Sequence, residues 1–255
     1  MILLQQRYDS PDPARQGELC AARAANASCP AFTELVDVDG AAKRWTFADL
    51  LQMAADRFRG KACVIANSDI SFTASIADAG RLLQPNTLVA LTRWDDDAAP
   101  SMEGRVDSST WRFYSQSQDA WIFIAGGLPP FAADFRLGIP RCENRFAYEA
   151  AAAGVVVVNP ALSLRTRHHH GTNLRTWKRA EHYRGPLFFP RLTTLDVPAP
   201  EGIVVDRRWG RHERLIRLDG SAASFQMQLT AAGPASLRRL PRVGLRSPFY
   251  IRRRG

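Results

Sequence analysis

The chain has 255 residues, of which 45% are hydrophobic, and carries a formal net charge of +9. This length suits one large α/β domain, or one domain with an appendage. No apolar run reaches the ~20 residues of a transmembrane helix, and the N-terminus lacks the apolar segment and cleavage site of a signal peptide. Its four cysteines have no Cys-x-x-Cys spacing, which argues against a zinc ribbon and for reduced thiols. We therefore expect a cytoplasmic protein.

The charge is unevenly distributed along the chain. Residues 1–164 have a net charge of −4, and residues 165–255 have a net charge of +13. A basic segment of this kind suits an anionic partner, such as nucleic acid, a membrane surface or a phosphorylated ligand. Only 3 of the 34 basic residues are lysine, so general arginine usage accounts for part of the excess. We expect an anion-binding surface, and we do not expect nucleic acid to be the partner.

Apolar runs alternate with helical patterns over the first two-thirds of the chain. Thr46 is an N-cap and Gly60 a helix end in this pattern, which predicts an α/β fold with a mostly parallel central sheet flanked by helices. Prolines interrupt the pattern after about residue 175, so we predict one domain over 1–175 and an irregular, basic extension over 176–255. The predicted strands are 1–8, 32–38, 63–66, 87–94, 121–125, 155–158, 202–206 and 213–218. The predicted helices are 16–27, 47–58, 75–83 and 140–153.

Polar residues stand at the ends of several predicted strands. If the strands are parallel, these ends converge at one edge, where open α/β sheets bind ligands. A hard cation such as Mg²⁺ or Mn²⁺ prefers oxygen ligands, which Asp69 provides. Alternatively, Asp69 only caps the next element. The residues in question are Gln6, Arg7, Tyr8, Asn67, Ser68, Asp69, Arg93, Asp95, Gln118, Asp119 and Asn159.

The sequence lacks the common nucleotide and hydrolase motifs. It has no Gly-x-Gly-x-x-Gly after the first strand, no P-loop and no Gly-x-Ser-x-Gly. Four separated strings instead resemble an uncharacterised branch of the GT-A-type glycosyltransferases, and the resemblance covers roughly residues 1–175. These strings are Ile-Ala-Asn-Ser-Asp-Ile (65–70), Ala-Leu-Thr-Arg-Trp (90–94), Ser-Gln-Asp-Ala-Trp (117–121) and Leu-Gly-Ile-Pro-Arg-Cys-Glu-Asn-Arg (137–145).

The resemblance implies a GT-A-like (Rossmann-like) domain that takes a nucleotide sugar and a glycan or other hydroxyl acceptor. Asn67-Ser68-Asp69 stands where this family carries its DxD-like metal motif. Asp69 would then hold Mn²⁺ or Mg²⁺, and the ion would neutralise the diphosphate leaving group. The motif departs from the family pattern because Asn67 offers only a neutral carbonyl oxygen. The residues expected to bind the donor are Gln6, Arg7, Tyr8, Asn67, Arg93 and Arg167.

An inverting transferase also needs a base for the acceptor hydroxyl. Glu143 is one candidate, because Pro140 suits a first helical turn and would place Glu143 near a helix N-terminus. The helix dipole would lower the pKa of this carboxyl and keep it ionised. Asp119 is the competing candidate. In the structural alternatives, Glu143 is a favourable first-turn charge and Asp119 is a turn residue.

His168-His169-His170 follows the last predicted strand of the first domain. On an extended segment, His168 and His170 face the same side and could bind a metal, or complete the site of Asp69. Alternatively, a histidine, Arg165, Arg167 or Arg175 holds the diphosphate, or the triplet is simply solvated. A zinc hydrolase site is a further possibility, but no Asp or Glu stands beside the triplet in the sequence. Asp95-Asp96-Asp97 is a second possible metal motif or a solvated acidic loop.

The sequence thus predicts a metal-assisted glycosyltransferase. Asparagine in the first motif position also leaves open a non-catalytic module on a degenerate GT-A core, which would bind a glycan, an anionic membrane surface or a partner enzyme. Nucleic-acid binding through the basic segment is the least favoured prediction, because no recognition motif accompanies the arginines.

Overall fold

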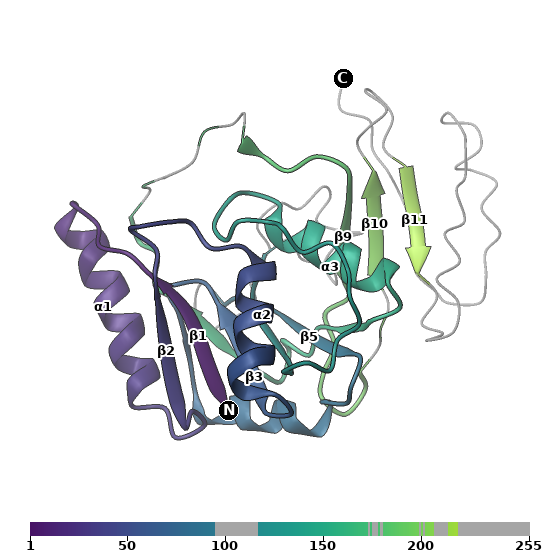
Figure 1. Ribbon diagram of the computed structural model, residues 1–255, viewed down its shortest axis with the longest axis horizontal. Helices are drawn as coiled ribbons and strands as arrows, with labels where there is room; N and C mark the ends of the chain where they lie inside the picture. The colour runs from purple at the N-terminus through teal and green to yellow at the C-terminus, as the bar shows by residue number, and fades with distance from the viewer. Residues whose placement is uncertain are drawn as a thin grey trace.

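A computed structural model describes residues 1–94, 117–172, 181–198, 202–206 and 214–218, together with Leu174, Lys178 and Pro200. The acidic string at 95–97 lies outside the described residues. The described chain forms a central sheet with helices on both faces (Figure 1). No helix in the described ranges is long and apolar enough to cross a membrane.

Six strands form the central sheet, in the order β2-β1-β3-β6-β5-β7. β1 is parallel to β2 and β3, and β5 is parallel to β7. β6 alone runs antiparallel to both of its neighbours, β3 and β5. The prediction of an α/β fold with a mostly parallel sheet is therefore confirmed. The bounds are β1 Ile2–Arg7, β2 Glu34–Asp39, β3 Ala62–Ala66, β5 Thr87–Thr92, β6 Gln118–Ile124 and β7 Val156–Val158.

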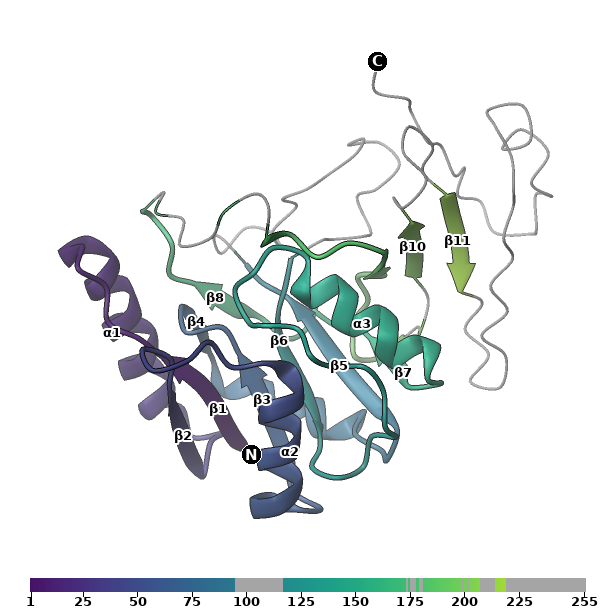
Figure 2. The same cartoon turned by 45° about the horizontal axis from the view of Figure 1, so that its top comes forward.

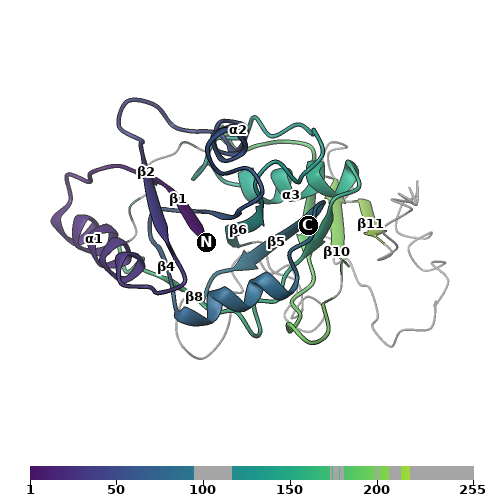
Figure 3. The ribbon, with the colours of Figure 1, turned by 60° about the horizontal axis from the view of Figure 1, so that its bottom comes forward.

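The sheet is buried on both faces, and its strand residues alternate between two apolar clusters. In β3, for example, Cys63 and Ile65 belong to one cluster while Val64 and Ala66 belong to the other. α2 (Phe47–Phe58) and α3 (Cys142–Ala152) cover the first face, and the 3₁₀ helix η1 (Ala74–Arg81) packs on the second (Figure 3).

Local signals explain where the helices begin. α1 (Pro13–Ala27) starts behind Asp12, whose side chain accepts a hydrogen bond from the Arg15 amide, with proline in the first turn. α2 starts with a capping box between Thr46 and Asp49. α3 begins at Cys142, two residues later than predicted, because Arg141 adopts a left-handed conformation (φ 74°).

Three strands of the structure are absent from the predicted set. β4 (Ile70–Phe72) and β8 (Thr166–His168) form a small antiparallel sheet (Figure 2), and β9 (Pro186–Pro190) pairs with β10 (Gly202–Asp206). β4 and β8 have three residues each, too few for a periodic pattern. β9 carries proline at both ends, which hides it in the sequence. The predicted strands at 202–206 and 213–218 correspond to β10 and β11 (Arg214–Leu218).

The reversed direction of β6 corrects one step of the sequence argument. Gln118 and Asp119 stand at the start of β6, so a fully parallel sheet would place them at the opposite edge from the strand ends. Because β6 is antiparallel, its start instead lies beside the ends of β3 and β5, with Ala120 opposite both Ala66 and Leu91. The polar residues of these three strands therefore do lie at one edge of the sheet, but because β6 is antiparallel and not because all strands are parallel.

Candidate functional site

The turn that carries Asn67, Ser68 and Asp69 connects β3 to β4 and is held by buried amides. Gln5 on β1 donates from its Nε2 to the carbonyl oxygens of Asn67 (2.9 Å) and Ile70 (3.2 Å). Asn26 at the end of α1 donates to the Gln5 side chain (3.1 Å) and to the Ile70 carbonyl (2.9 Å). The backbone that presents Asp69 is therefore fixed from two elements.

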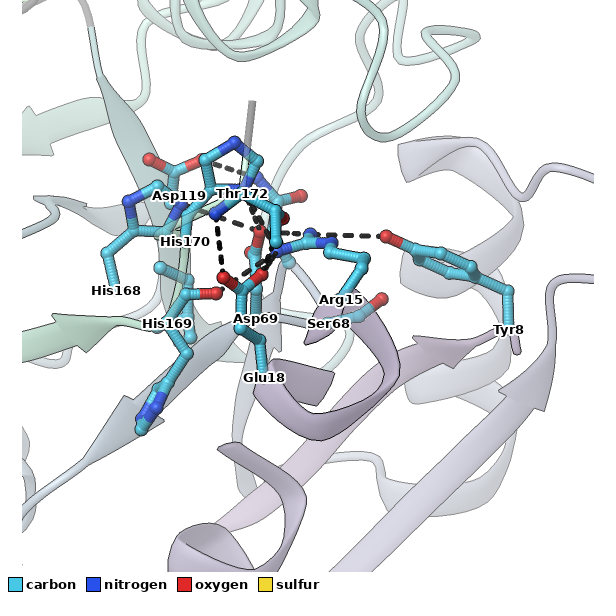
Figure 4. Close-up of polar contacts among 12 residues, drawn as sticks. Tyr8, Arg15, Glu18, Ser68, Asp69, Asp119, His168, His169, His170 and Thr172 are labelled. Carbon is cyan, nitrogen blue, oxygen red and sulfur yellow. Dashed lines mark hydrogen bonds and ion pairs between the residues drawn. The ribbon is translucent and has the colours of Figure 1, made fainter. Parts of the chain in front are cut away.

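Asp69 lies at the centre of a compact polar cluster (Figure 4). Its side chain is 12% exposed, and its Oδ2 atom accepts a hydrogen bond from Nη2 of Arg15 at 2.6 Å. The same oxygen lies 3.4 Å from Nε2 of His168 and 3.6 Å from Nδ1 of His170. One carboxylate oxygen thus faces three nitrogen-bearing groups.

The small sheet explains why the histidines meet Asp69. His168 stands opposite Ile70 in the β4–β8 pairing, and the amide of His169 donates to the Asp69 carbonyl at 2.8 Å. Side chains alternate along this extended segment, so His168 and His170 share a side, with their rings stacked at 5.0 Å. Arg167 alternates with His168 and is exposed, so the structure does not bring it into the cluster.

The charges in this cluster shift one another's ionisation. Burial by itself raises the pKa of Asp69, but His168, His170 and Arg15 outweigh it and hold that pKa well below its usual value. Burial by itself lowers the pKa of His168, but the hydrogen bond and charge of Asp69 raise it above its usual value. Asp69 is therefore an ionised carboxylate in a buried, positively charged setting.

These three side chains can hold a metal ion. One ligand atom from each of Asp69, His168 and His170 lies within 4.8 Å of the other two. This confirms that the sequence-predicted metal ligands form a group able to hold a cation. Two imidazoles and one carboxylate fit Mn²⁺, Fe²⁺ or Zn²⁺ better than Mg²⁺, which prefers oxygen.

Arg15 and Glu18 on α1 belong to the cluster, and the sequence reasoning missed both. Glu18 accepts hydrogen bonds from Arg15 (2.8 Å) and from the backbone amides of Gly171 (2.6 Å) and Thr172 (2.8 Å). Arg15 also donates to the His169 carbonyl at 3.1 Å. Hydrogen bonds from α1 therefore hold residues 168–172, the histidine segment, in place from outside the sheet. The i, i+3 spacing on a helix was the only sequence signal, and it is common on solvated helix faces.

Asp119 forms a second charged group beside the turn. Its carboxylate accepts hydrogen bonds from the side chains of Asn67 and Arg93, the latter at 3.0 Å. The Asp119 side chain is 11% exposed. Asp119 at the start of β6 thus contacts two other residues predicted to belong to the site, which directly follow β3 and β5.

Glu143 lies in the first turn of α3, as predicted, but its ionisation differs from the prediction. Burial, and after it the negative charge of Asp119, raise the pKa of this half-buried carboxyl to about 8. The expectation that the helix dipole keeps Glu143 readily ionised is therefore wrong. The charge of Asp119 raises the pKa of Glu143 and the charge of Arg93 lowers it, so Glu143 is electrostatically coupled to the second charged group.

The three residues predicted at the end of β1, Gln6, Arg7 and Tyr8, differ in what their side chains contact. The Gln6 side chain accepts a hydrogen bond from the Trp45 amide at 2.6 Å, and its backbone carbonyl accepts one from the Ser68 hydroxyl. The Tyr8 hydroxyl accepts a hydrogen bond from Arg15 at 3.2 Å. Arg7 is exposed. Tyr8 thus joins the Asp69 cluster, and Gln6 supports its turn.

Comparisons of the chain with protein-family models, with curated proteins and with solved structures find no match. Only the geometry of the site and the four sequence strings within residues 65–145 indicate what this protein does.

Proposed function

We propose that this protein is a glycosyltransferase that moves a sugar from a nucleotide-diphosphate donor to a glycan or another hydroxyl acceptor, assisted by a divalent metal. One observation carries the proposal. A buried strand, β3, ends in the Asn67–Asp69 turn at the carboxyl edge of the sheet, and there Asp69, His168 and His170 meet as a group able to hold a cation. Ligands bind at this edge in open α/β sheets.

Cleaving the donor's sugar–phosphate bond leaves a nucleoside diphosphate with additional negative charge. A cation held by Asp69, His168 and His170 would neutralise part of that charge. The histidines compensate for the missing first aspartate of the motif, because they supply the additional ligands that Asn67 cannot. Asn67 instead donates its amide to Asp119.

Glu143 is the better of the two proposed bases. The Asp119 carboxylate already accepts hydrogen bonds from Asn67 and Arg93, so it is less available to an acceptor hydroxyl. Glu143 has a pKa of about 8, close to the value at which a general base is most effective near neutral pH. Asp119 then contributes by raising the basicity of Glu143.

Calorimetric titration tests the proposal. The purified protein is titrated with a panel of nucleoside diphosphates, with and without Mn²⁺, and the same titrations are made with Asp69→Asn and with Asp78→Asn as the control at an exposed position. We expect Mn²⁺-dependent nucleotide binding in the wild type and the control, weakened at least tenfold in Asp69→Asn. Nucleotide binding that is unchanged by Mn²⁺ and by Asp69→Asn would contradict the proposed site.

A second candidate function follows from Arg15. Its guanidinium already neutralises Asp69, with Nη2 of Arg15 2.6 Å from the carboxylate. A protein that keeps this ion pair permanently would be a non-catalytic binding module on the same fold. Such a module would bind a glycan without hydrolysing or transferring the sugar of any nucleotide-sugar donor. Release of a nucleoside diphosphate in the presence of protein, Mn²⁺, donor and a glycan acceptor separates the two candidates.

A further inference from the structure

Arg15 contacts two of the side chains that a cation would use. Its Nη2 atom lies 2.6 Å from Oδ2 of Asp69, and its Nη1 atom lies 2.9 Å from Nδ1 of His170. Two of the three residues able to ligate a metal are therefore already in contact with the guanidinium.

A metal ion and this arrangement of Arg15 exclude each other. An imidazole nitrogen has one lone pair, so Nδ1 of His170 cannot accept a hydrogen bond from Arg15 and bind a metal ion at the same time. Ligand atoms bind a transition metal at ~2.0–2.2 Å, so an ion held by both Oδ2 and Nδ1 would also lie beside the guanidinium. Both groups are also positively charged, and arginine does not lose its proton in proteins. Arg15 must therefore leave Asp69 and His170 before an ion can use those atoms.

The structure also provides partners for Arg15 after it has left Asp69. Nη1 donates to Glu18 at 2.8 Å, and Nη2 donates to the Tyr8 hydroxyl at 3.2 Å. Neither partner belongs to the candidate metal group. The Glu18 contacts to Gly171 and Thr172 do not involve Arg15, so the histidine segment keeps its anchor when the guanidinium moves.

We propose that Arg15 is a resident counter-ion of Asp69 that a divalent metal ion must displace, so that the protein alternates between an arginine-filled and a metal-filled site. This inference rests on the metal site of the proposed function. In the arginine-filled state the buried carboxylate stays neutralised without a metal, which avoids the instability of an unpaired buried charge. The same ion pair lowers the apparent metal affinity, because its loss opposes binding.

The experiment compares metal binding by variants of α1. MnCl₂ alone is titrated into the wild type, Arg15→Met and Asp69→Asn, and melting temperatures are measured with and without the salt. Arg23→Met is the matched control, because Arg23 is on the same helix and pairs with Asp37 at an exposed position. Arg15→Lys is a second test variant. It keeps a positive charge beside Asp69, so the test can still be made if Arg15→Met does not fold.

We expect Arg15→Met to bind Mn²⁺ at least tenfold more tightly than the wild type, and Arg15→Lys to lie between them. Arg15→Met should melt below the wild type without metal and recover with Mn²⁺, while Arg23→Met should match the wild type in affinity. Equal or weaker binding by both Arg15 variants would overturn the inference. Absence of Mn²⁺ binding in every variant would overturn it as well. Nucleotide binding, measured separately, decides whether the proposed function also fails.

Discussion

Glu143 lies in the first turn of α3, where the helix terminus stabilises a negative charge by about 0.3–1 kcal/mol. Its pKa is nevertheless raised to about 8, because burial and the charge of Asp119 act in the opposite direction. Each pKa unit corresponds to about 1.4 kcal/mol, so the surroundings outweigh the dipole several-fold. The sequence reveals the helix terminus but not the burial or the neighbouring carboxylate.

This shift predicts how stability depends on pH. Below the unfolded-state pKa of about 4.5, Glu143 is protonated in both states and has no effect. As the pH rises from 4.5 to 8, the unfolded chain loses this proton while the folded protein keeps it, so folding becomes less favourable. Linkage alone would make Glu143→Gln more stable than the wild type by about 4 kcal/mol at pH 8, and solvent screening of the half-buried carboxyl reduces this to roughly 2 kcal/mol, with little difference at pH 4.5.

Urea denaturation of both proteins across this pH range measures the difference. Asp78→Asn is the control, because Asp78 is exposed. A stability difference between Glu143→Gln and the wild type that stays constant with pH would show that the Glu143 carboxyl ionises normally in the folded protein.

At the scale of single elements, α1 acts on the histidine segment through Glu18. This carboxylate accepts four hydrogen bonds, three of them from Gly171 and Thr172, and its pKa is lowered to about 2 because these bonds outweigh its burial. We expect Glu18→Ala to release the segment and to weaken Mn²⁺ binding by roughly tenfold or more, since support of metal ligands typically contributes 10–100-fold in affinity.

Calorimetry with MnCl₂ measures this effect, and Glu34→Ala is the control. Glu34 also pairs with an arginine, Arg57, but on the exposed end of β2. If Glu18→Ala binds Mn²⁺ as the wild type does, then α1 does not position the histidines.

The turn between β3 and β4 depends on Asn26 in a similar way. This fully buried amide donates to Gln5 and Ile70 and accepts a hydrogen bond from the Phe72 amide at 3.1 Å. Asn26→Leu would leave these buried partners unpaired, so we expect a loss of about 2–4 kcal/mol in the free energy of unfolding. Thermal denaturation measures it. Ser28→Ala, at an exposed position two residues away, should change stability by less than ~0.5 kcal/mol.

The elements with a clear period were predictable from the sequence, and the elements that complete the site were not. The helix over residues 47–58 and the strands predicted at 63–66 and 87–94 follow from apolar spacing and capping residues, although the second strand ends at Thr92 in the structure. Strands of three residues, such as β4 and β8, have no period to detect. The sequence predicted Asp69, His168 and His170 as possible ligands. It did not predict how they meet, because the contact of His168 with Asp69 depends on pairing between strands almost 100 residues apart, and it did not predict that Arg15 joins them.

At the scale of the whole molecule, β9 belongs to the main core although it follows the predicted domain boundary at residue 175. Phe188 is fully buried in the same apolar cluster as Phe146 of α3, and its carbonyl accepts a hydrogen bond from Asn144. The division at residue 175 stays a prediction. A test of nucleic-acid binding should neutralise arginines rather than remove residues 176–255, because removal would also delete β9.

Phe188→Ala tests how far the fold depends on β9. Deleting a fully buried phenylalanine leaves a cavity, so we expect a loss of about 3–5 kcal/mol. Leu174→Ala is the control, because Leu174 is 45% exposed and its truncation should have little effect. Chemical denaturation compares the two. Similar losses in both variants would show that β9 packs only loosely on the domain.

The reversed direction of β6 has a consequence for how this protein can diversify. β5 ends and β6 begins at the same edge, where the Arg93 amide donates to the Ser117 carbonyl at 3.1 Å and Arg93 pairs with Asp119. The chain leaves the sheet and re-enters it at neighbouring points, so closing a longer or shorter connection between them changes the entropy only slightly. Segments from other proteins could therefore be grafted between residues 94 and 117, next to the Arg93–Asp119 pair, without changing the register of any strand.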